Sequence, residues 1–175
     1  MEDEEVALDE LARQFLAAMA AKEAGRADHA EEALRAILKF EPRLPEPRLE
    51  LARILLDTDR VAEAEDEARE GLDCLEQSGP WSEDLEPDQI TALGKALLAD
   101  CLRRQAEEDD VIFGDPERFK ALVTESRALF TEAARLDPSD EYASYHAFFM
   151  GTGQVDPDAD PEVAPGRELD PEPEP

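Results

Sequence analysis

The sequence repeats one helical pattern at an interval of 34 residues. The stretches AGRADHAEEALRAILKFEP (24–42) and TDRVAEAEDEAREGLDCLE (58–76) each begin with a turn and an arginine, followed by alanines at helical spacing. A shift of 34 positions superposes identical residues at several places, among them Ala18 on Ala52, Arg26 on Arg60, Ala30 on Ala64 and Leu38 on Leu72. A constant interval of this length is typical of chains built from stacked helical hairpins.

Apolar residues recur every three or four positions between residues 6 and 150, and no segment shows sustained alternation with a period of two. This periodicity predicts an all-α fold. Helices are expected at residues 6–24, 27–40, 45–57, 60–76, 87–109, 116–136 and 139–150. The turn residues agree, because Gly25 is suited to ending the first helix, and Asp115 to capping a helix that starts at Pro116.

The repeated small residues indicate how the helices pack. Ala18 and Ala30 in the first pair, and Ala52 and Ala64 in the second, would let paired backbones approach closely. Leucines at the neighbouring positions would fill the space between one pair and the next. Because a single pair leaves an apolar face open, the pairs must stack.

With these features, the chain resembles the tetratricopeptide repeat family. The residues that carry the resemblance are Ala17, Ala18, Gly25, Ala30, Leu34, Ile37 and Pro42 in the first unit, and Leu51, Ala52, Ala64, Ala68, Gly71 and Leu72 in the second. Leu93 and Ser126 hold matching positions in a third unit that carries an insertion of about 20 residues relative to the repeat. The resemblance implies an α-solenoid of antiparallel helix pairs at residues 1–150, with units at about 9–42, 43–76 and 87–138 and a capping helix at 139–150.

The resemblance also implies a concave surface, formed mainly by the first helix of each pair, that binds a peptide segment. The positions that map to this surface are Phe15, Met19, Lys22, Leu49, Arg53, Leu56 and Lys95. Together they suit a peptide with apolar residues and a carboxylate. The alternative for Lys22 and Arg53 is that they form ordinary surface ion pairs, with Asp57 available to Arg53.

Aromatic residues gather late in the chain and suggest a second surface. Tyr142, Tyr145 and Phe149 share one face of the last helix, with Phe148 on the other side. This face either covers the open end of the third unit or binds a partner. Trp81, in a loop beside Gly79 and Pro80, is either an exposed anchor for a partner or a side chain tucked under the inserted hairpin.

The charge of the chain excludes two classes of partner. It carries 46 acidic and 18 basic residues, for a formal net charge of −28. Such a field repels nucleic acids and anionic membranes, and it would steer a basic partner toward the chain. Residues 151–175 are acidic, rich in proline and poor in large apolar side chains, so we expect a disordered tail there.

The sequence offers little that could carry catalysis. His29 and His146 lie apart, with no nucleophile nearby in sequence, and no spacing is typical of a metal or cofactor site. Cys74 and Cys101 lie among apolar residues and are expected to be buried, reduced thiols. The acidic N-terminus does not resemble a signal peptide, and no apolar run is long enough to cross a membrane, so a cytoplasmic location is expected.

These observations predict a non-enzymatic adaptor, a monomer or weak homodimer, that binds a peptide or protein segment. Two alternatives stay open. The first is a small chaperone for an export or assembly substrate, and the second is an accessory subunit of a larger complex. A partner that aggregates without this chain would favour the chaperone, and a partner that always co-purifies with it would favour the accessory subunit.

Overall fold

The computed structural model describes residues 2–82 and 84–152, and all regular elements in this part of the chain are helices. They are α1 (Glu2–Glu23), α2 (Ala27–Phe40), α3 (Pro45–Asp57), α4 (Val61–Ser78), α5 (Pro87–Ala106), α6 (Asp109–Gly114), α7 (Pro116–Leu136) and α8 (Glu141–Thr152). The predicted all-α fold is therefore confirmed. The boundaries expected from the sequence agree within a few residues for α2, α3, α4 and α7.

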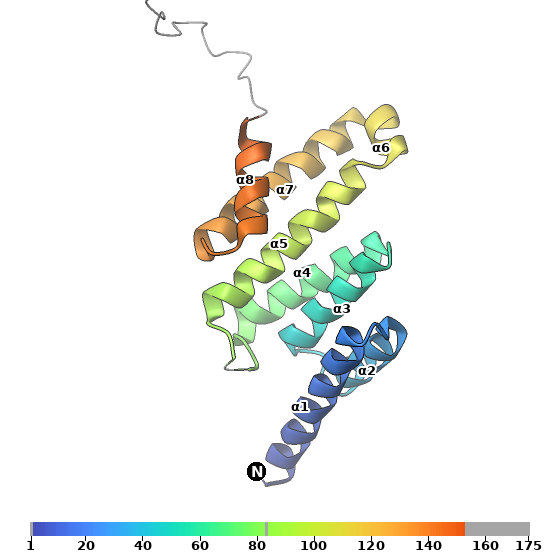
Figure 1. Ribbon diagram of the computed structural model, residues 1–175, viewed down its shortest axis with the longest axis vertical. Helices are drawn as coiled ribbons and strands as arrows, with labels where there is room; N and C mark the ends of the chain where they lie inside the picture. Colours follow the sequence, from blue (N-terminus) through green and yellow to red (C-terminus); the bar gives the residue numbers. More distant parts are fainter. Residues whose placement is uncertain (1, 83, 153–175) are drawn as a thin grey trace, which may run out of the picture.

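The helices form antiparallel pairs that follow one another along the molecule (Figure 1). Helix α1 pairs with α2, α3 with α4, and the long α5 with the long α7, while α8 packs against α7. Each pair also contacts the next, through α2 with α3 and through α4 with α5. This arrangement is an α-solenoid like that of the tetratricopeptide repeat, as the sequence predicts.

The turn that follows the first helix has the same conformation in the first and the second repeat. Gly25 has φ 74° and Asp59, at the equivalent position, has φ 63°. In both turns the amide of the next residue donates to the carbonyl five positions earlier, Arg26 N to Ala21 O at 2.9 Å and Arg60 N to Leu55 O at 2.8 Å. The repeat in sequence is therefore a repeat in backbone geometry, and aspartate tolerates the left-handed conformation in place of glycine.

Alanines form the contacts between the paired helices. Ala18, Ala30, Ala52 and Ala64 are each at most 1% exposed and belong to one hydrophobic core. Because alanine ends at Cβ, these contacts bring the helix backbones close together. Leu34, Leu51 and Leu55 fill the rest of this core and are fully buried. The small and the larger residues that the sequence predicts to pack together therefore share one core.

Two glycines allow α3, α4 and α5 to meet around Leu49. A Cβ atom added to Gly71 would lie 2.9 Å from Leu49 Cδ2 and 3.1 Å from Leu49 Cγ. A Cβ atom added to Gly94 would lie 2.8 Å from Leu72 Cδ2 and 3.3 Å from Leu49 Cδ2. Leu49 is only 7% exposed, so it is enclosed where the second and third pairs join.

The insertion in the third unit lengthens α5 and α7 and adds α6 at their far end (Figure 1). The predicted helix at 87–109 is wrong at its end, because α5 stops at Ala106 and Asp109 begins α6. Four consecutive acidic residues, 107–110, account for the break. Negative side chains are unfavourable at the C-terminus of a helix and favourable at an N-terminus, where Asp109 and Asp110 now lie. Pro116 begins α7, and Asp115 Oδ1 accepts from the amide of Arg118 at 3.0 Å, as predicted.

The expected disordered tail at 151–175 lies outside the described residues apart from the end of α8. Within the described residues, no helix is both long enough and apolar enough to span a bilayer.

The contact at Gly71 gives a test of the packing. Replacing Gly71 with alanine forces Leu49 to move, because both Cγ and Cδ2 lie too close to the new methyl group. Overpacking costs about 1–3 kcal/mol, against a gain of about 1 kcal/mol in helix propensity. We expect the free energy of unfolding of Gly71→Ala to fall by about 1 kcal/mol in urea denaturation.

Gly114→Ala is the matched control, since no atom lies within 4 Å of its added Cβ. It should be as stable as the wild type or slightly more stable. A Gly71→Ala protein that gains stability to the same extent as Gly114→Ala would contradict the packing described for Leu49.

Candidate functional site

Two neighbouring cavities lie along the first helices of the pairs, α1, α3 and α5. The smaller has a volume of about 290 Å³ and lies between these three helices and the loop before α5. The larger, of about 570 Å³, lies between α3, α5, the turn from α7 to α8, and α8 itself. Arg53, Leu93 and Leu97 line both cavities. The two cavities therefore form one continuous candidate surface, which we call the first-helix surface.

The smaller cavity is mostly apolar. It is lined by Phe15, Leu16, Met19, Leu49, Leu85, Ile90, Leu93 and Leu97, together with Glu46, Glu50, Arg53, Ser82 and Asp84. Leu16 is 65% exposed and Leu93 is 37% exposed. Large apolar side chains that remain open to solvent inside a concavity are suited to receiving an apolar side chain of a ligand.

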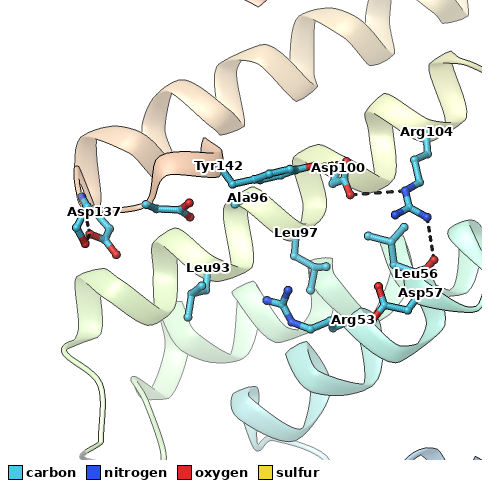
Figure 2. A pocket seen from close by; sticks show the side chains of 12 residues that line it. Arg53, Leu56, Asp57, Leu93, Ala96, Leu97, Asp100, Arg104, Asp137 and Tyr142 are labelled. Atoms are coloured by element: carbon cyan, nitrogen blue, oxygen red, sulfur yellow. Dashed lines mark hydrogen bonds and ion pairs between the residues drawn. The ribbon is translucent and has the colours of Figure 1, made fainter. Parts of the chain in front are cut away.

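The larger cavity has both apolar and polar lining residues, and the polar ones include Asp100 (Figure 2). Asp100 is 8% exposed, and its Oδ1 accepts from Tyr142 Oη at 2.9 Å and from Arg103 Nη2 at 2.7 Å. Arg104 lies 3.6 Å from Asp100 Oδ2 through Nε and donates from Nη1 to the carbonyl of Leu56 at 3.0 Å. Burial, reinforced by the charge of Asp100, raises the pKa of Tyr142, so its hydroxyl remains a donor at neutral pH.

Arg53 differs from these paired cations. It is half-buried, and within the described residues it forms no ion pair and no side-chain hydrogen bond. Figure 2 shows its guanidinium extending into the cavity toward Leu93 and Leu97, away from Asp57. The surface ion pair with Asp57 that the sequence allowed does not form. A half-buried guanidinium with five donors and no protein acceptor is able to donate hydrogen bonds to an anionic group.

The structure brings together most of the residues predicted for the groove. Phe15, Met19, Leu49 and Arg53 line the smaller cavity, and Leu56 joins Arg53 in the larger. Leu49 and Leu56 are only 7% and 3% exposed, so they pack beneath the surface and offer little area to a ligand.

The two predicted lysines take other roles. Lys22 forms an ion pair with Glu50 that links α1 to α3. Lys95 lies on the opposite side of α5, in a separate cavity beside α4 and α7, and pairs with Glu132 at 2.8 Å. Neither is a free cation on the first-helix surface.

A shift in register explains the position of Lys95. The insertion changes the spacing between the second and third units. The sequence comparison paired Arg53 with Lys95, which lies 42 positions later. In the structure, the residue on α5 that lines the cavities with Arg53 is Leu97, which lies 44 positions later. An error of two residues rotates a helical position by about 200°. The sequence comparison missed three residues of the first-helix surface: Leu93, Leu97 and Asp100. They lie at the same spacing, 44 positions, after Leu49, Arg53 and Leu56. Leu16 carries no repeat signal, because its counterpart is Glu50.

Trp81 packs against the first unit instead of the inserted hairpin. Its ring meets Phe15 edge-on with centroids 5.8 Å apart, and it is half-buried beside Leu11, Ile37 and Leu44. Glu46 holds this loop in place, because its Oε1 accepts from the amides of Trp81 at 2.8 Å and Ser82 at 2.9 Å. Glu46 Oε2 is buried and has no donor among the described residues.

The aromatic residues of α8 divide between two environments. Tyr142 packs edge-on against the buried Phe130 with centroids 5.9 Å apart, and His146 stacks on Phe130 at 4.8 Å. These two side chains cover the end of the third pair. Tyr145 and Phe149 are 57% and 54% exposed. The ring of Tyr145 contacts both His146 and Phe149.

The cysteines and histidines do not line either of the two cavities. Burial raises the pKa of the Cys101 thiol to about 12, and both cysteines are buried and reduced, as predicted. His29 is exposed on α2. Across residues 2–82 and 84–152, no three His, Cys, Asp or Glu side chains are placed to hold a metal ion.

The loop that carries Trp81 can be tested by fluorescence, because the chain contains one tryptophan. Glu46→Ala leaves two backbone amides without their acceptor, so we expect the loop to open and the emission of Trp81 to shift to longer wavelength. Loss of the two hydrogen bonds should also lower the stability by about 1–3 kcal/mol. Glu50→Ala, one turn further along α3, should leave the emission unchanged, and an equal shift in both variants would contradict the role of Glu46.

The stacking of His146 gives a pH dependence with a defined sign. Burial, together with the positive charge of Arg103, holds the pKa of His146 below its ordinary value. The folded state therefore binds this proton less readily than the unfolded state, and stability is lost as the pH falls from about 7 to about 5. We expect the free energy of unfolding of the wild type to fall more over this range than that of His146→Gln. Parallel pH profiles for the two proteins would contradict the assignment.

Comparison with known families matches residues 21–78 to a model described as Tetratricopeptide repeat. The matched segment runs from the last turn of α1 to the end of α4, so it includes both equivalent turns and three of the four contact alanines, Ala30, Ala52 and Ala64. A search of curated proteins finds no match to the chain. The family match, the 34-residue register and the stacked helix pairs together identify residues 21–78 as tetratricopeptide repeats.

Proposed function

We propose that this protein is a non-enzymatic adaptor that binds a segment of a partner protein on its first-helix surface. Tetratricopeptide repeats generally mediate protein–protein interactions, which supports a binding role. The segment would place an apolar side chain in the smaller cavity and a carboxylate against Arg53.

The observation that carries the proposal is the position of Arg53. Its guanidinium borders both cavities, and no described residue neutralises it, although the chain carries 46 acidic residues. A carboxylate there would gain charge-assisted hydrogen bonds in a partly desolvated site. The nearby acidic side chains Asp137 and Asp140 would favour a basic or amide group next to that carboxylate in the bound segment.

The apolar lining supports the same kind of ligand. Phe15, Leu16 and Met19 on α1 face Leu93 on α5 across the smaller cavity. Methionine and leucine side chains adapt to different apolar shapes, so this cavity would accept more than one residue type. Arg53 would then supply the more selective contact.

The test is selection from a library of random displayed peptides against the full-length protein, followed by affinity measurements on the selected peptides. Arg53→Glu should weaken binding by about tenfold or more, because a hydrogen bond to a charged group contributes about 1.5–3 kcal/mol. Lys120→Glu changes the net charge equally at an exposed position on α7 and is the matched control.

The selected peptides should contain an acidic residue or depend on a free C-terminal carboxylate, and amidation or neutralisation of that group should reproduce the loss seen in Arg53→Glu. If the two charge variants bind equally well, or if no peptide is selected, the first-helix surface is not the binding site.

A further inference from the structure

Glu46 lines the smaller cavity with a carboxylate that has one oxygen left without a partner. Its side chain is enclosed, since the residue is only 8% exposed. Oε1 accepts from the amides of Trp81 and Ser82, whereas Oε2 is buried and has no donor among the described residues. Buried polar atoms in proteins almost always have a hydrogen-bond partner, and the lack of one costs free energy. A ligand in the cavity that donates to Oε2 would therefore supply a bond that the chain itself does not.

The charges around the smaller cavity indicate what kind of donor suits this oxygen. Three carboxylates line it, those of Glu46, Glu50 and Asp84, and Arg53 is the one basic side chain among its lining residues. Glu50 is neutralised by its ion pair with Lys22 of α1. Asp84 is exposed and lies in the loop that Glu46 holds. The part of the cavity near this loop therefore carries an excess of negative charge, which favours a cationic donor over a neutral one.

Glu46 and Arg53 lie seven residues apart on the side of α3 that lines the cavity. Seven residues are about two helical turns, or about 10 Å along the axis. Phe15, Met19 and Leu93 line the same cavity. An extended chain advances about 3.3 Å per residue, and alternate side chains point to the same side. A bound segment would thus reach Glu46 and Arg53 with residues about two to four positions apart, and an apolar residue between them would face the lining.

A lysine suits Oε2 better than an arginine does. The planar guanidinium of arginine is matched to both oxygens of a carboxylate, and Glu46 has only one oxygen left. The ammonium of lysine is compact and carries three donors. Its flexible stem also sets it apart from an N-terminal ammonium, because the methylene groups can lie along the apolar lining while the charged end reaches a covered oxygen.

We propose that Glu46 binds a lysine side chain of the partner segment, whose ammonium donates to Oε2. This second anchor rests on the proposed adaptor function, since both contacts belong to one bound segment. Glu46 and Arg53 then recognise opposite charges on either side of an apolar residue. Acetylation of the lysine releases the segment, because it removes the charge and leaves a single donor.

Glu46→Gln isolates this contact from the support of the loop. The amide keeps one oxygen, which can still accept from the two loop amides, and places a donor where Oε2 was. We expect the emission of Trp81 to stay at its wild-type wavelength, in contrast to Glu46→Ala. Peptides selected from the random displayed library against the full-length protein should contain a lysine, and they should bind Glu46→Gln about tenfold more weakly. Glu32→Gln, at an exposed position on α2, is the matched control and should bind as the wild type does.

Changes in the selected peptides test the same contact without altering the protein. Acetylation of the peptide lysine should weaken binding to the wild type about tenfold and have little further effect on binding to Glu46→Gln, because the two changes remove one interaction. Acetylation of the peptide N-terminus should have no effect. These measurements on the wild type decide the matter even if Glu46→Gln shifts the emission of Trp81.

Four results would overturn the proposal. Peptides that need a carboxylate and Arg53 but no lysine would leave the adaptor function standing and remove this role of Glu46. A lysine that matters equally in the wild type and in Glu46→Gln, but not in Asp140→Asn, would lie in the larger cavity. An effect of N-terminal acetylation in place of lysine acetylation would assign the contact to the end of the peptide. Selection of no peptide at all would overturn the adaptor function and the lysine contact together.

Discussion

The close approach of helix backbones at buried alanines determines the rest of this structure. Ala18, Ala30, Ala52 and Ala64 are essentially inaccessible to solvent, and a longer side chain at any of them would separate the paired helices. Because these contacts repeat every 34 residues, each pair presents the same edge to its neighbour. The pairs therefore stack in a row and do not close into a bundle, which leaves the surface of α1, α3 and α5 open.

Ion pairs fix the neighbouring units in this register. Arg60 in the second repeat binds Glu31 of the first with Nη1 to Oε1 and Oε2 distances of 2.8 and 2.9 Å. Arg69 on α4 connects to Glu125 on α7 at 2.9 Å. Most of the described basic residues form an ion pair, either between units in this way or within one unit. A half-buried arginine without a protein partner, as at position 53, is therefore informative in this molecule, where acceptors are abundant.

The sequence was sufficient to predict the part of the fold in which the repeat is strict. The 34-residue register located α1 to α4. The structure adds that Asp59, at the position equivalent to Gly25, has the same left-handed backbone. The sequence was not sufficient where the insertion interrupts the 34-residue interval. There, the side of α5 that faces α3 depends on tertiary packing around Leu49, which the repeat does not encode. Lys95 was predicted on the wrong side of α5 for this reason, and Leu93 and Asp100 were missed. The loop that carries Trp81 was also beyond sequence reasoning, because Glu46, 35 positions earlier, determines its path.

Tyr142 connects the larger cavity with the side of α8 that packs on α7. Its hydroxyl donates to Asp100 in the larger cavity at 2.9 Å, and its ring lies 4.5 Å from that of His146 on the packed side of α8. His146 in turn contacts Tyr145, with ring centroids 5.3 Å apart. One series of side-chain contacts thus joins Asp100 in the cavity to Tyr145 on α8. Any displacement of α8 would move Tyr142 and change the donors around Asp100, so the end of the solenoid and its concave surface form one packed unit.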